Sequence, residues 1–592
     1  MSPLIALYCT SFHSNNRNHK FMHEESWRNM FPDYSPYQHV LDQYDDLEPT
    51  LVGILQSRLS DAIRRFTAMN LQPRILRITA SDNTLYRDYI IELLKKSINK
   101  SSSNNENTVE QPIIIAGDNV THEKLFGAVY PAKDGETQPQ RKHGLLHQAH
   151  NGYLVLSITA ILSDPSLWPQ LKNVLMNGQL EWQPITNKSL YELPATETVN
   201  VKLIIIGERY LMAELDAAEP DLSDGMAMYG EFEQDLLLNE ATLTDYISYI
   251  KGISQYYNLP SLADSDAIRA LLFAGARHAE DQTRLPLCPL WHLNLLSEAS
   301  VESEGNLITA GHIKASLRAK EYRESYLPER AIADIHHGQV LIATEGEEIG
   351  QVNGLTVVEM PGHPSAYGEP ARISCVVHFG DGDITDVERK VELGGNIHAK
   401  GMMIMQAFVA TALDLDQALP YSASIVFEQS YSEVDGDSAS LAELCALVSA
   451  LSFQPINQEI AVTGAVDQFG RVQAVGGINQ KIEGFYKVCV HRGLTGNQGV
   501  ILPHTNLSSL CLNDEVIEAI KAKQFHIWAV SNVDEAIPRL TNKVFRSENE
   551  DDETILSLIE ERIDYFHHGD LSDQIGIMNR LRLMISNWLG QN

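Results

Sequence analysis

A serine and a lysine, each close to glycine residues, could together form a hydrolytic site. Ser438 lies in the segment Asp435-Gly436-Asp437-Ser438-Ala439-Ser440, after a strand that is predicted over 422–427. From Leu441 onward the apolar residues follow helical spacing, so Ser438 is predicted at the start of a helix. Free backbone N–H groups at a helix N-terminus favour negative charge, which suits the oxyanion of an acyl-transfer reaction. A serine hydroxyl is a weak nucleophile, however, and needs a base.

Lys481 is the candidate for that base. It follows the glycine pair Gly476-Gly477, and its neighbours supply apolar cover: Ile478, Ile482, Phe485 and Tyr486. A lysine acts as a base only when neutral, so burial must lower its pKa by several units from about 10.4. Taken separately, a serine in such a turn is more often a helix N-cap, and a lysine on a helix is usually a solvated charge. The two segments together are a much more specific signal for nucleophilic catalysis.

The first part of the chain alternates strands and helices. Apolar spacing predicts strands over 75–79, 153–156 and 201–207, and helices over 51–69 and 84–96. This alternation is typical of a parallel α/β sheet. Polar residues over 97–107 predict a linker or surface loop after the second helix.

Five segments follow from these patterns, and together they predict an α/β multidomain protein. They are an N-terminal extension (1–50), an α/β module (51–235), a small all-helical lid (236–330), a second mixed α/β domain (345–540), and an acidic linker with C-terminal helices (547–592). A chain of 592 residues is too long for one hydrophobic core, so three or four folded domains are expected.

Composition weighs against several classes of function. The net charge of −33 disfavours nucleic acid, whose phosphates are bound through concentrated positive charge. No apolar run reaches the roughly 18 residues of a membrane helix, and the start of the chain lacks a secretory-signal pattern. Six scattered cysteines without a CxxC pair favour reduced thiols in a cytoplasmic protein. His122-Glu123 begins like an HExxH zinc motif, but Phe126 takes the place of the second histidine, so no metal site is predicted.

The region from Glu345 to Arg539 resembles the Lon family of serine proteases, and most of all its B-type branch. Besides the serine and lysine segments, the resemblance is carried by Gly362–Pro364, Pro370–Ile373, Gly380–Arg389, Gly394–Gly401 and Ala461–Gly464. It implies that Ser438 is the nucleophile and Lys481 the general base. It also implies that Thr463 orients the lysine, and that Asp435 corresponds to an acidic residue near the dyad. The ordinary alternatives are that Thr463 is a strand residue and Asp435 a turn former.

Two segments of the first half, 119–127 and 144–154, resemble the AAA+ module of B-type Lon proteases, which implies an AAA+-like fold over about 51–330. The chemical parts of a nucleotide site do not match. The P-loop position has the sequence Ile78-Thr79-Ala80-Ser81-Asp82-Asn83-Thr84, without glycine or lysine and with an added acid that would repel phosphate. Ser157-Ile158 replaces the Asp-Glu pair that would hold Mg²⁺, and no arginine finger is found over 219–225. The three losses argue against ATP hydrolysis and leave nucleotide binding open.

The leading hypothesis is therefore a cytoplasmic Lon-like serine endopeptidase with a degenerate AAA+-like module. It would cleave unfolded or flexible proteins without ATP and would need no cofactor for peptide hydrolysis. The resemblance implies a homo-oligomer, a hexameric ring, with no nucleic-acid or membrane partner. Two alternatives stay open: an ATP-dependent protease with a divergent nucleotide site, and a non-proteolytic chaperone or scaffold of the same fold.

Overall fold

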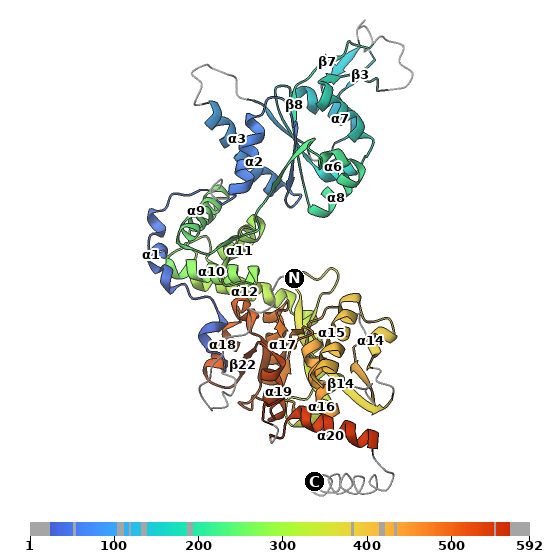
Figure 1. Cartoon of the computed structure of the whole chain (residues 1–592). Helices are drawn as coiled ribbons and strands as arrows, with labels where there is room; N and C mark the ends of the chain where they lie inside the picture. The colour runs from blue at the N-terminus through green and yellow to red at the C-terminus, as the bar shows by residue number, and fades with distance from the viewer. Residues whose placement is uncertain are drawn as a thin grey trace, which may run out of the picture. The chain divides into compact units, whose positions relative to one another are not determined.

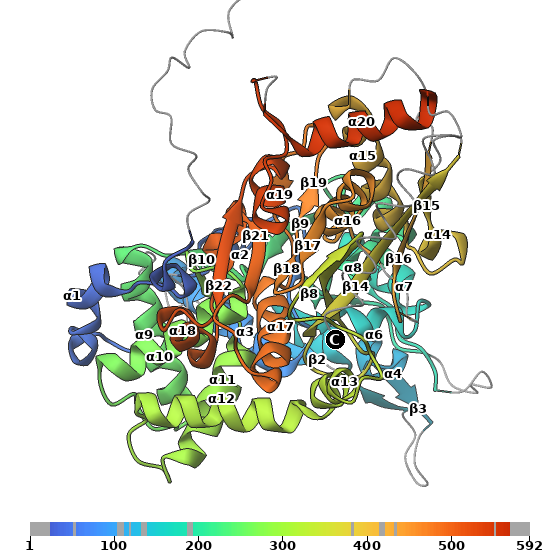
Figure 2. The same cartoon turned by 90° about the horizontal axis from the view of Figure 1, so that it is seen from below.

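The computed structural model describes residues 24–50, 55–102, 112–117, 120–131, 139–185, 193–380, 384–413, 421–430, 435–549 and 552–568. The chain forms two compact units (Figures 1 and 2). One unit comprises 34–279 and 283–319, and the other comprises the N-terminal segment to residue 33, residues 280–282 and the chain from residue 320 onward. The domain boundaries expected from the sequence divide these units further and stay predictions.

The first unit contains a parallel five-stranded sheet in the order β2-β5-β8-β1-β9. Its strands are β2 (Ile114–Gly117), β5 (Gly152–Ser157), β8 (Val201–Gly207), β1 (Ile75–Thr79) and β9 (Ala227–Glu231). Neighbouring residues of a strand face opposite sides of the sheet, so Ile204 and Ile206 lie in one core while Leu203 and Ile205 lie in another. The strands predicted over 75–79, 153–156 and 201–207 are confirmed.

Helices cover both faces of this sheet, as Figure 1 shows in its upper part. One face packs against α2 (Ser57–Ala68) and α3 (Thr84–Ser102). The other packs against α4 (His122–Phe126), α5 (Leu145–Gln148), α6 (Ile158–Leu162), α7 (Leu167–Asn177) and α8 (Arg209–Ala218). The mixed α/β class with a parallel sheet, predicted for this region, is confirmed.

The same unit continues into the helices predicted as a lid: α9 (Glu240–Tyr256), α10 (Ser265–Ala279), α11 (Pro289–Glu302) and α12 (Ala310–Glu324), the last of which runs on into the second unit. Helix α1 (Gln38–Leu41) buries Val40 and Leu41 in their core, and the Tyr34 hydroxyl donates to the Leu272 carbonyl over 3.0 Å. Tyr34, Val40 and Leu41 therefore pack in the core of this unit, to which residues 34–50 belong.

The second unit contains a mixed seven-stranded sheet in the order β15-β16-β14-β13-β18-β21-β22. Its strands are β15 (Ile384–Asp386), β16 (Tyr421–Phe427), β14 (Tyr367–Phe379), β13 (Gln351–Val358), β18 (Ile460–Val462), β21 (Gly499–Pro503) and β22 (His526–Val530). Strands β16, β14 and β13 are antiparallel, whereas β13, β18, β21 and β22 run parallel.

Two groups of helices cover the two faces of this sheet. One face carries α15 (Asn396–Ala412), α16 (Ser440–Ser452), α19 (Val533–Thr541) and α20 (Ile555–His568). The other carries α17 (Ile478–Arg492) and α18 (Asp514–Lys521), together with Met30 from the N-terminal segment. Every residue of α16 is buried, which makes this helix the centre of the core.

Helix α20 completes that core from the C-terminal end of the described chain. Its residues Ile555, Ile559 and Ile563 are buried in the same cluster as α16. The guanidinium of Arg562 donates to the carbonyls of Ala450 and Leu451, over 2.6 and 2.9 Å, at the C-terminus of α16. The free carbonyls that end a helix are thus satisfied by a side chain from a distant segment.

Two sequence predictions differ from the structure. Helix α3 continues to Ser102, although a linker was predicted from residue 97, because Ile98 extends the apolar face and is only 7% exposed. Helix α2 begins at Ser57 instead of residue 51, and residues 51–54 lie outside the described residues. Among the described residues, no helix combines the length and apolar character that crossing a membrane requires.

Candidate active site

Ser438 lies in the turn that leads into α16. The turn is closed by hydrogen bonds from Gly464 N to Ser438 O over 2.9 Å and from Ser440 N to Asp437 O over 3.1 Å. The Ser440 side chain strengthens it, because Oγ donates to Asp437 O and accepts from Val466 N. Gly436 has a φ of +108°, which a residue with a Cβ atom rarely adopts. Ser438 is therefore held, half-buried, in one backbone geometry.

The structure brings Lys481 to this serine. Its Nζ lies 2.9 Å from Ser438 Oγ and 3.2 Å from Thr463 Oγ1. Lys481 is only 2% exposed. Burial lowers the pKa of Lys481 to about 8, while the negative charge of Asp437 acts in the opposite direction. A buried amine with a pKa near neutrality can accept a proton, which an ordinary surface lysine cannot do at the same pH.

Close backbone packing sets the position of Lys481. Helix α17 lies against β14 at Gly368, where a Cβ atom would stand 2.0 Å from the carbonyl oxygen of Gln480. Gly477, just before the helix, has a φ of +62°, and a Cβ atom there would stand 2.5 Å from Val357 Cγ2. The two glycines let the helix approach the sheet closely enough for the first turn of α17 to reach the serine.

Thr463 contacts both Ser438 and Lys481. It follows β18 directly and is fully buried. Its hydroxyl donates to the Ser438 carbonyl over 3.2 Å and accepts from Lys481 Nζ. One side chain therefore ties the backbone of the serine turn to the amine of the lysine.

Asp435 has a different environment. It is exposed, and its Oδ1 accepts from the backbone N–H groups of Ile397 and His398 over 3.2 and 3.4 Å. These groups belong to the first turn of α15, whose N-cap, Gly395, has no side chain to satisfy them. A Cβ atom on Gly395 would lie 2.3 Å from Asp435 Oδ1, so this glycine makes room for the carboxylate.

The acidic residue that acts on Lys481 is therefore Asp437. Over the described ranges, no hydrogen bond or ion pair joins Asp435 to Ser438, Lys481 or Thr463. Asp437 was part of the serine segment in the sequence, where its residue type did not distinguish it from Asp435. Position relative to the serine was the one available signal, since Asp437 is its immediate neighbour.

The first unit contains the strand ends at which an AAA+ module would hold its nucleotide. Asp82, in the loop between β1 and α3, accepts hydrogen bonds from Ser157 Oγ over 2.5 Å and from Thr159 Oγ1 over 2.7 Å. Ser157 ends β5, so the carboxyl ends of the two strands are linked by these side chains. The N-terminus of α3 is capped by Asn83, whose Oδ1 accepts from Tyr86 N over 3.1 Å. Oxygen atoms of the protein thus accept from N–H and O–H groups that could otherwise donate to a phosphate.

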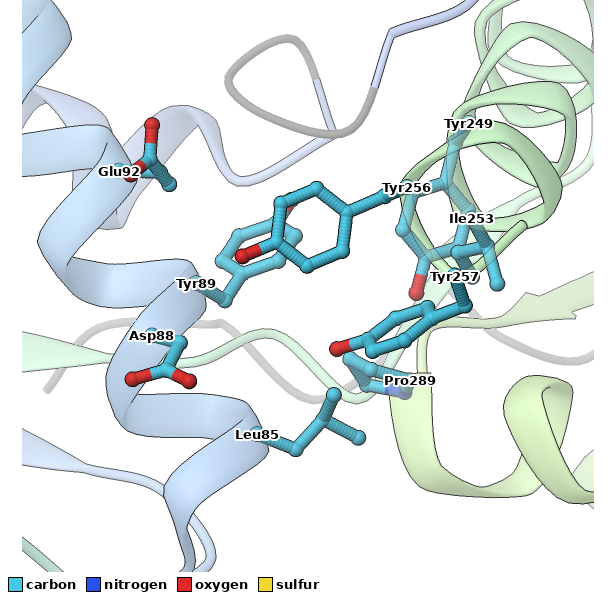
Figure 3. A pocket seen from close by; sticks show the side chains of 9 residues that line it. All are labelled: Leu85, Asp88, Tyr89, Glu92, Tyr249, Ile253, Tyr256, Tyr257 and Pro289. Atoms are coloured by element: carbon cyan, nitrogen blue, oxygen red, sulfur yellow. The ribbon is translucent and has the colours of Figure 1, made fainter.

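A shallow pocket of the same unit lies between α3 and α9 (Figure 3). Its walls carry tyrosines from both helices and two carboxylates, Asp88 and Glu92, from α3. None of the nine side chains that line it is basic. A phosphate group would meet negative charge there, so this pocket offers no substitute for the missing P-loop.

Three family models match separate parts of the chain. The "LonB-like, AAA domain" model matches residues 109–233, and the "Archaeal LonB, AAA+ ATPase LID domain" model matches residues 263–323. The "Lon protease C-terminal proteolytic domain" model matches residues 424–542, which include Ser438, Thr463 and Lys481.

Curated proteins give the same result over longer stretches. A Lon protease homologue of Haemophilus influenzae is 42% identical over 74% of this chain and 74% of its own length. The archaeal Lon protease of Thermococcus kodakarensis is 26% identical over 67% of this chain and 60% of its own. A Lon protease homologue of Escherichia coli is 41% identical over 91% of this chain and 95% of its own length. The chain described here therefore belongs to the Lon protease family.

Proposed function

We propose that the chain is a serine endopeptidase in which Ser438 is the nucleophile and Lys481 the general base. The observation that carries this proposal is the 2.9 Å contact between Lys481 Nζ and Ser438 Oγ, made by a lysine that is 2% exposed. Burial lowers the pKa of Lys481 to about 8, so a useful fraction of the amine is neutral near physiological pH. Membership of the Lon family supports the same class of reaction.

In the acylation step, neutral Lys481 takes the hydroxyl proton of Ser438 as Oγ forms a bond to the carbonyl carbon. The ammonium then gives this proton to the departing amine as the C–N bond of the peptide breaks. In deacylation a water molecule replaces the amine, and Lys481 first removes its proton and later returns one to Ser438. Thr463 acts as a positioning residue, because its hydroxyl contacts both the amine and the serine carbonyl.

ATP is not required in this proposal. The support is the hydrogen-bonded cluster of Asp82, Ser157 and Thr159 at the sheet edge where phosphates and Mg²⁺ would bind. The acidic Asp82 would repel phosphate there, and its partners would lose their hydrogen bonds on nucleotide binding. Without a motor, substrates would be unfolded or flexible polypeptides that enter unaided.

Two further features accompany the proposal. The AAA-like module of the family supports an oligomer, and a hexameric ring is proposed by analogy with Lon proteases. Light scattering of the purified protein tests this by measuring the mass of the assembly. A cytoplasmic location is supported by the free thiols of Cys288, Cys375, Cys445, Cys489 and Cys511, which suit a reducing compartment.

The test is cleavage of fluorescently labelled unfolded casein by the purified protein, with and without Mg-ATP, beside Ser438→Ala. We expect cleavage that ignores ATP and is lost in the variant. Cleavage only with ATP would favour the alternative of an ATP-dependent protease. No cleavage in any condition, together with no labelling of Ser438 by a fluorophosphonate probe, would favour a non-proteolytic chaperone or scaffold.

A further inference from the structure

Three potential metal ligands meet inside the second unit, apart from the serine and the lysine. Asp386 ends β15, Glu388 lies in the short helix α14 (Val387–Lys390), and His398 lies in the first turn of α15. One ligand atom from each lies within 4.8 Å of the others. The side chains of His398 and Asp386 are 2% and 7% exposed, and Glu388 is 5% exposed. The three groups therefore converge in the interior of the domain.

The atoms that converge make no hydrogen bond of ordinary geometry among the described residues. Asp386 Oδ2, Glu388 Oε2 and His398 Nε2 are all buried, and the ion pair between Asp386 Oδ2 and His398 Nε2 at 3.2 Å leaves Glu388 Oε2 without a described partner of either kind. The other oxygen of Glu388 is in use, because Oε1 accepts from Phe427 N over 2.8 Å. Buried polar atoms are almost always paired, and leaving a carboxylate oxygen unpaired destabilises the fold. The unpaired oxygen of Glu388 beside the Asp386–His398 pair indicates that a further group binds between the three side chains.

A third acidic residue lies behind the histidine. Glu443, on α16, is 1% exposed, and its Oε1 stands 3.7 Å from His398 Nδ1. The nitrogen on the opposite side of the ring, Nε2, faces Asp386 at 3.2 Å. A histidine that binds a metal commonly directs its second ring nitrogen toward a carboxylate, which orients the ring and increases its basicity. Glu443, the His398 ring and the oxygens of Asp386 and Glu388 follow this arrangement.

The charge of this cluster also favours a bound cation. Three buried carboxylates surround a single imidazole, and over the described ranges no lysine or arginine forms an ion pair with any of them. Buried charges are stable when they are paired or coordinate a metal. We propose that Asp386, Glu388 and His398 Nε2 bind one divalent transition-metal ion, with Glu443 as the carboxylate that orients the histidine.

The donor set narrows the identity of the ion. Two carboxylates and one imidazole suit Zn²⁺, Mn²⁺ or Fe²⁺, whereas Mg²⁺ and Ca²⁺ favour oxygen ligands alone. No metal site is predicted from the sequence, because ligands at positions 386, 388 and 398 follow no common zinc spacing. The turn between α14 and α15 brings these three residues together, whereas Glu443 comes from the distant helix α16.

The ion would have a structural role. Its ligands connect β15, α14 and α15, and Glu443 extends the connection to α16, the helix that follows Ser438. Asp435, in the serine turn, caps the same first turn of α15 that contains His398. The bound ion would therefore hold α15 in place against the serine turn, and it would supply no group to the reaction.

The experiment measures metal retention by the full-length protein. The protein is stripped with a chelator, incubated with Zn²⁺ or Mn²⁺ separately, desalted and measured by mass spectrometry of the metals. Wild type is expected to retain about one ion per chain, and His398→Gln and Glu388→Gln less than about a tenth of that. Glu443→Gln should bind the ion about 10- to 100-fold more weakly. The control is Glu483→Gln, a buried glutamate whose Oε1 accepts from Asn513 N over 2.9 Å, which should retain the wild-type amount.

Thermal melting provides a second readout that does not depend on desalting. Adding the retained metal should raise the melting temperature of stripped wild type and of Glu483→Gln, and should leave that of Glu388→Gln unchanged. The amide oxygen of the glutamine introduced by Glu388→Gln can still accept from Phe427 N, so this variant is expected to fold. Retention of equal amounts of metal by wild type and the ligand variants would overturn the proposal. So would a wild type that binds neither ion, since the cluster would then be held by shared protons.

Discussion

Raising the pH from 7 to 9 should increase the rate of Ser438 acylation about tenfold, with a plateau above pH 9. The pKa of Lys481 is lowered to about 8 by burial, so about a tenth of the amine is neutral at pH 7 and about nine-tenths at pH 9. A lysine with its ordinary pKa would instead give a rate that rises about 100-fold over this range without levelling off. The shape of the curve therefore separates a buried base from a solvated one.

The assay is the rate of fluorophosphonate labelling of Ser438 between pH 6 and 10, which isolates the attack of Oγ from substrate binding and product release. Asp437→Asn should shift the midpoint to lower pH, because the carboxylate of Asp437 raises the pKa of Lys481. Asp435→Asn is the control and should leave the midpoint in place, since Asp435 contacts the N-terminus of α15 instead. A log rate that climbs linearly through pH 9, or a midpoint that shifts equally in both variants, would refute the assigned base.

Three other predictions follow from single contacts. Lys481→Met should abolish labelling yet stabilise the fold by about 3 kcal/mol at pH 7, since folding of the variant no longer lowers a lysine pKa from 10.5 to about 8. In urea unfolding, this gain should be full below pH 8 and should disappear toward pH 10.5. Gly368→Ala should lower the labelling rate and destabilise the fold by about 1–3 kcal/mol, because its Cβ atom would meet the Gln480 carbonyl at 2.0 Å. Gly476→Ala, which has open space at that position, is its control in the same labelling and melting assays. Asp82→Ala should destabilise the fold by about 1–2 kcal/mol through loss of two hydrogen bonds, and casein cleavage should remain independent of ATP.

Strands were the most predictable part of the fold. The predicted bounds 75–79 and 201–207 coincide with β1 and β8, because parallel strands buried on both faces are mostly apolar, although Arg77 and Lys202 interrupt these two runs. The end of α3 was missed, since its last turns are polar apart from Ile98, and only the packing of that residue keeps them helical.

The serine and the lysine could be found from their segments, and the structure places them 2.9 Å apart. Their acidic neighbours could not be assigned in the same way. Asp435 and Asp437 are two residues apart in one turn, and only the backbone path directs the carboxylate of Asp435 to α15 while the charge of Asp437 acts on the lysine. The cluster around His398 was not predicted because Asp386, Glu388 and His398 follow no common metal motif, and because only the packing of α16 brings Glu443 to them.

The contact between α20 and α16 bears on how this protein can be divided. The match to the proteolytic family domain ends at residue 542, yet Ile555, Ile559 and Ile563 fill the same core farther along the chain. A fragment trimmed to the matched region would leave an apolar stripe of α16 uncovered and the two carbonyls held by Arg562 without a donor. Expression of the isolated protease part should therefore extend to at least residue 568, and a fusion partner belongs beyond that point.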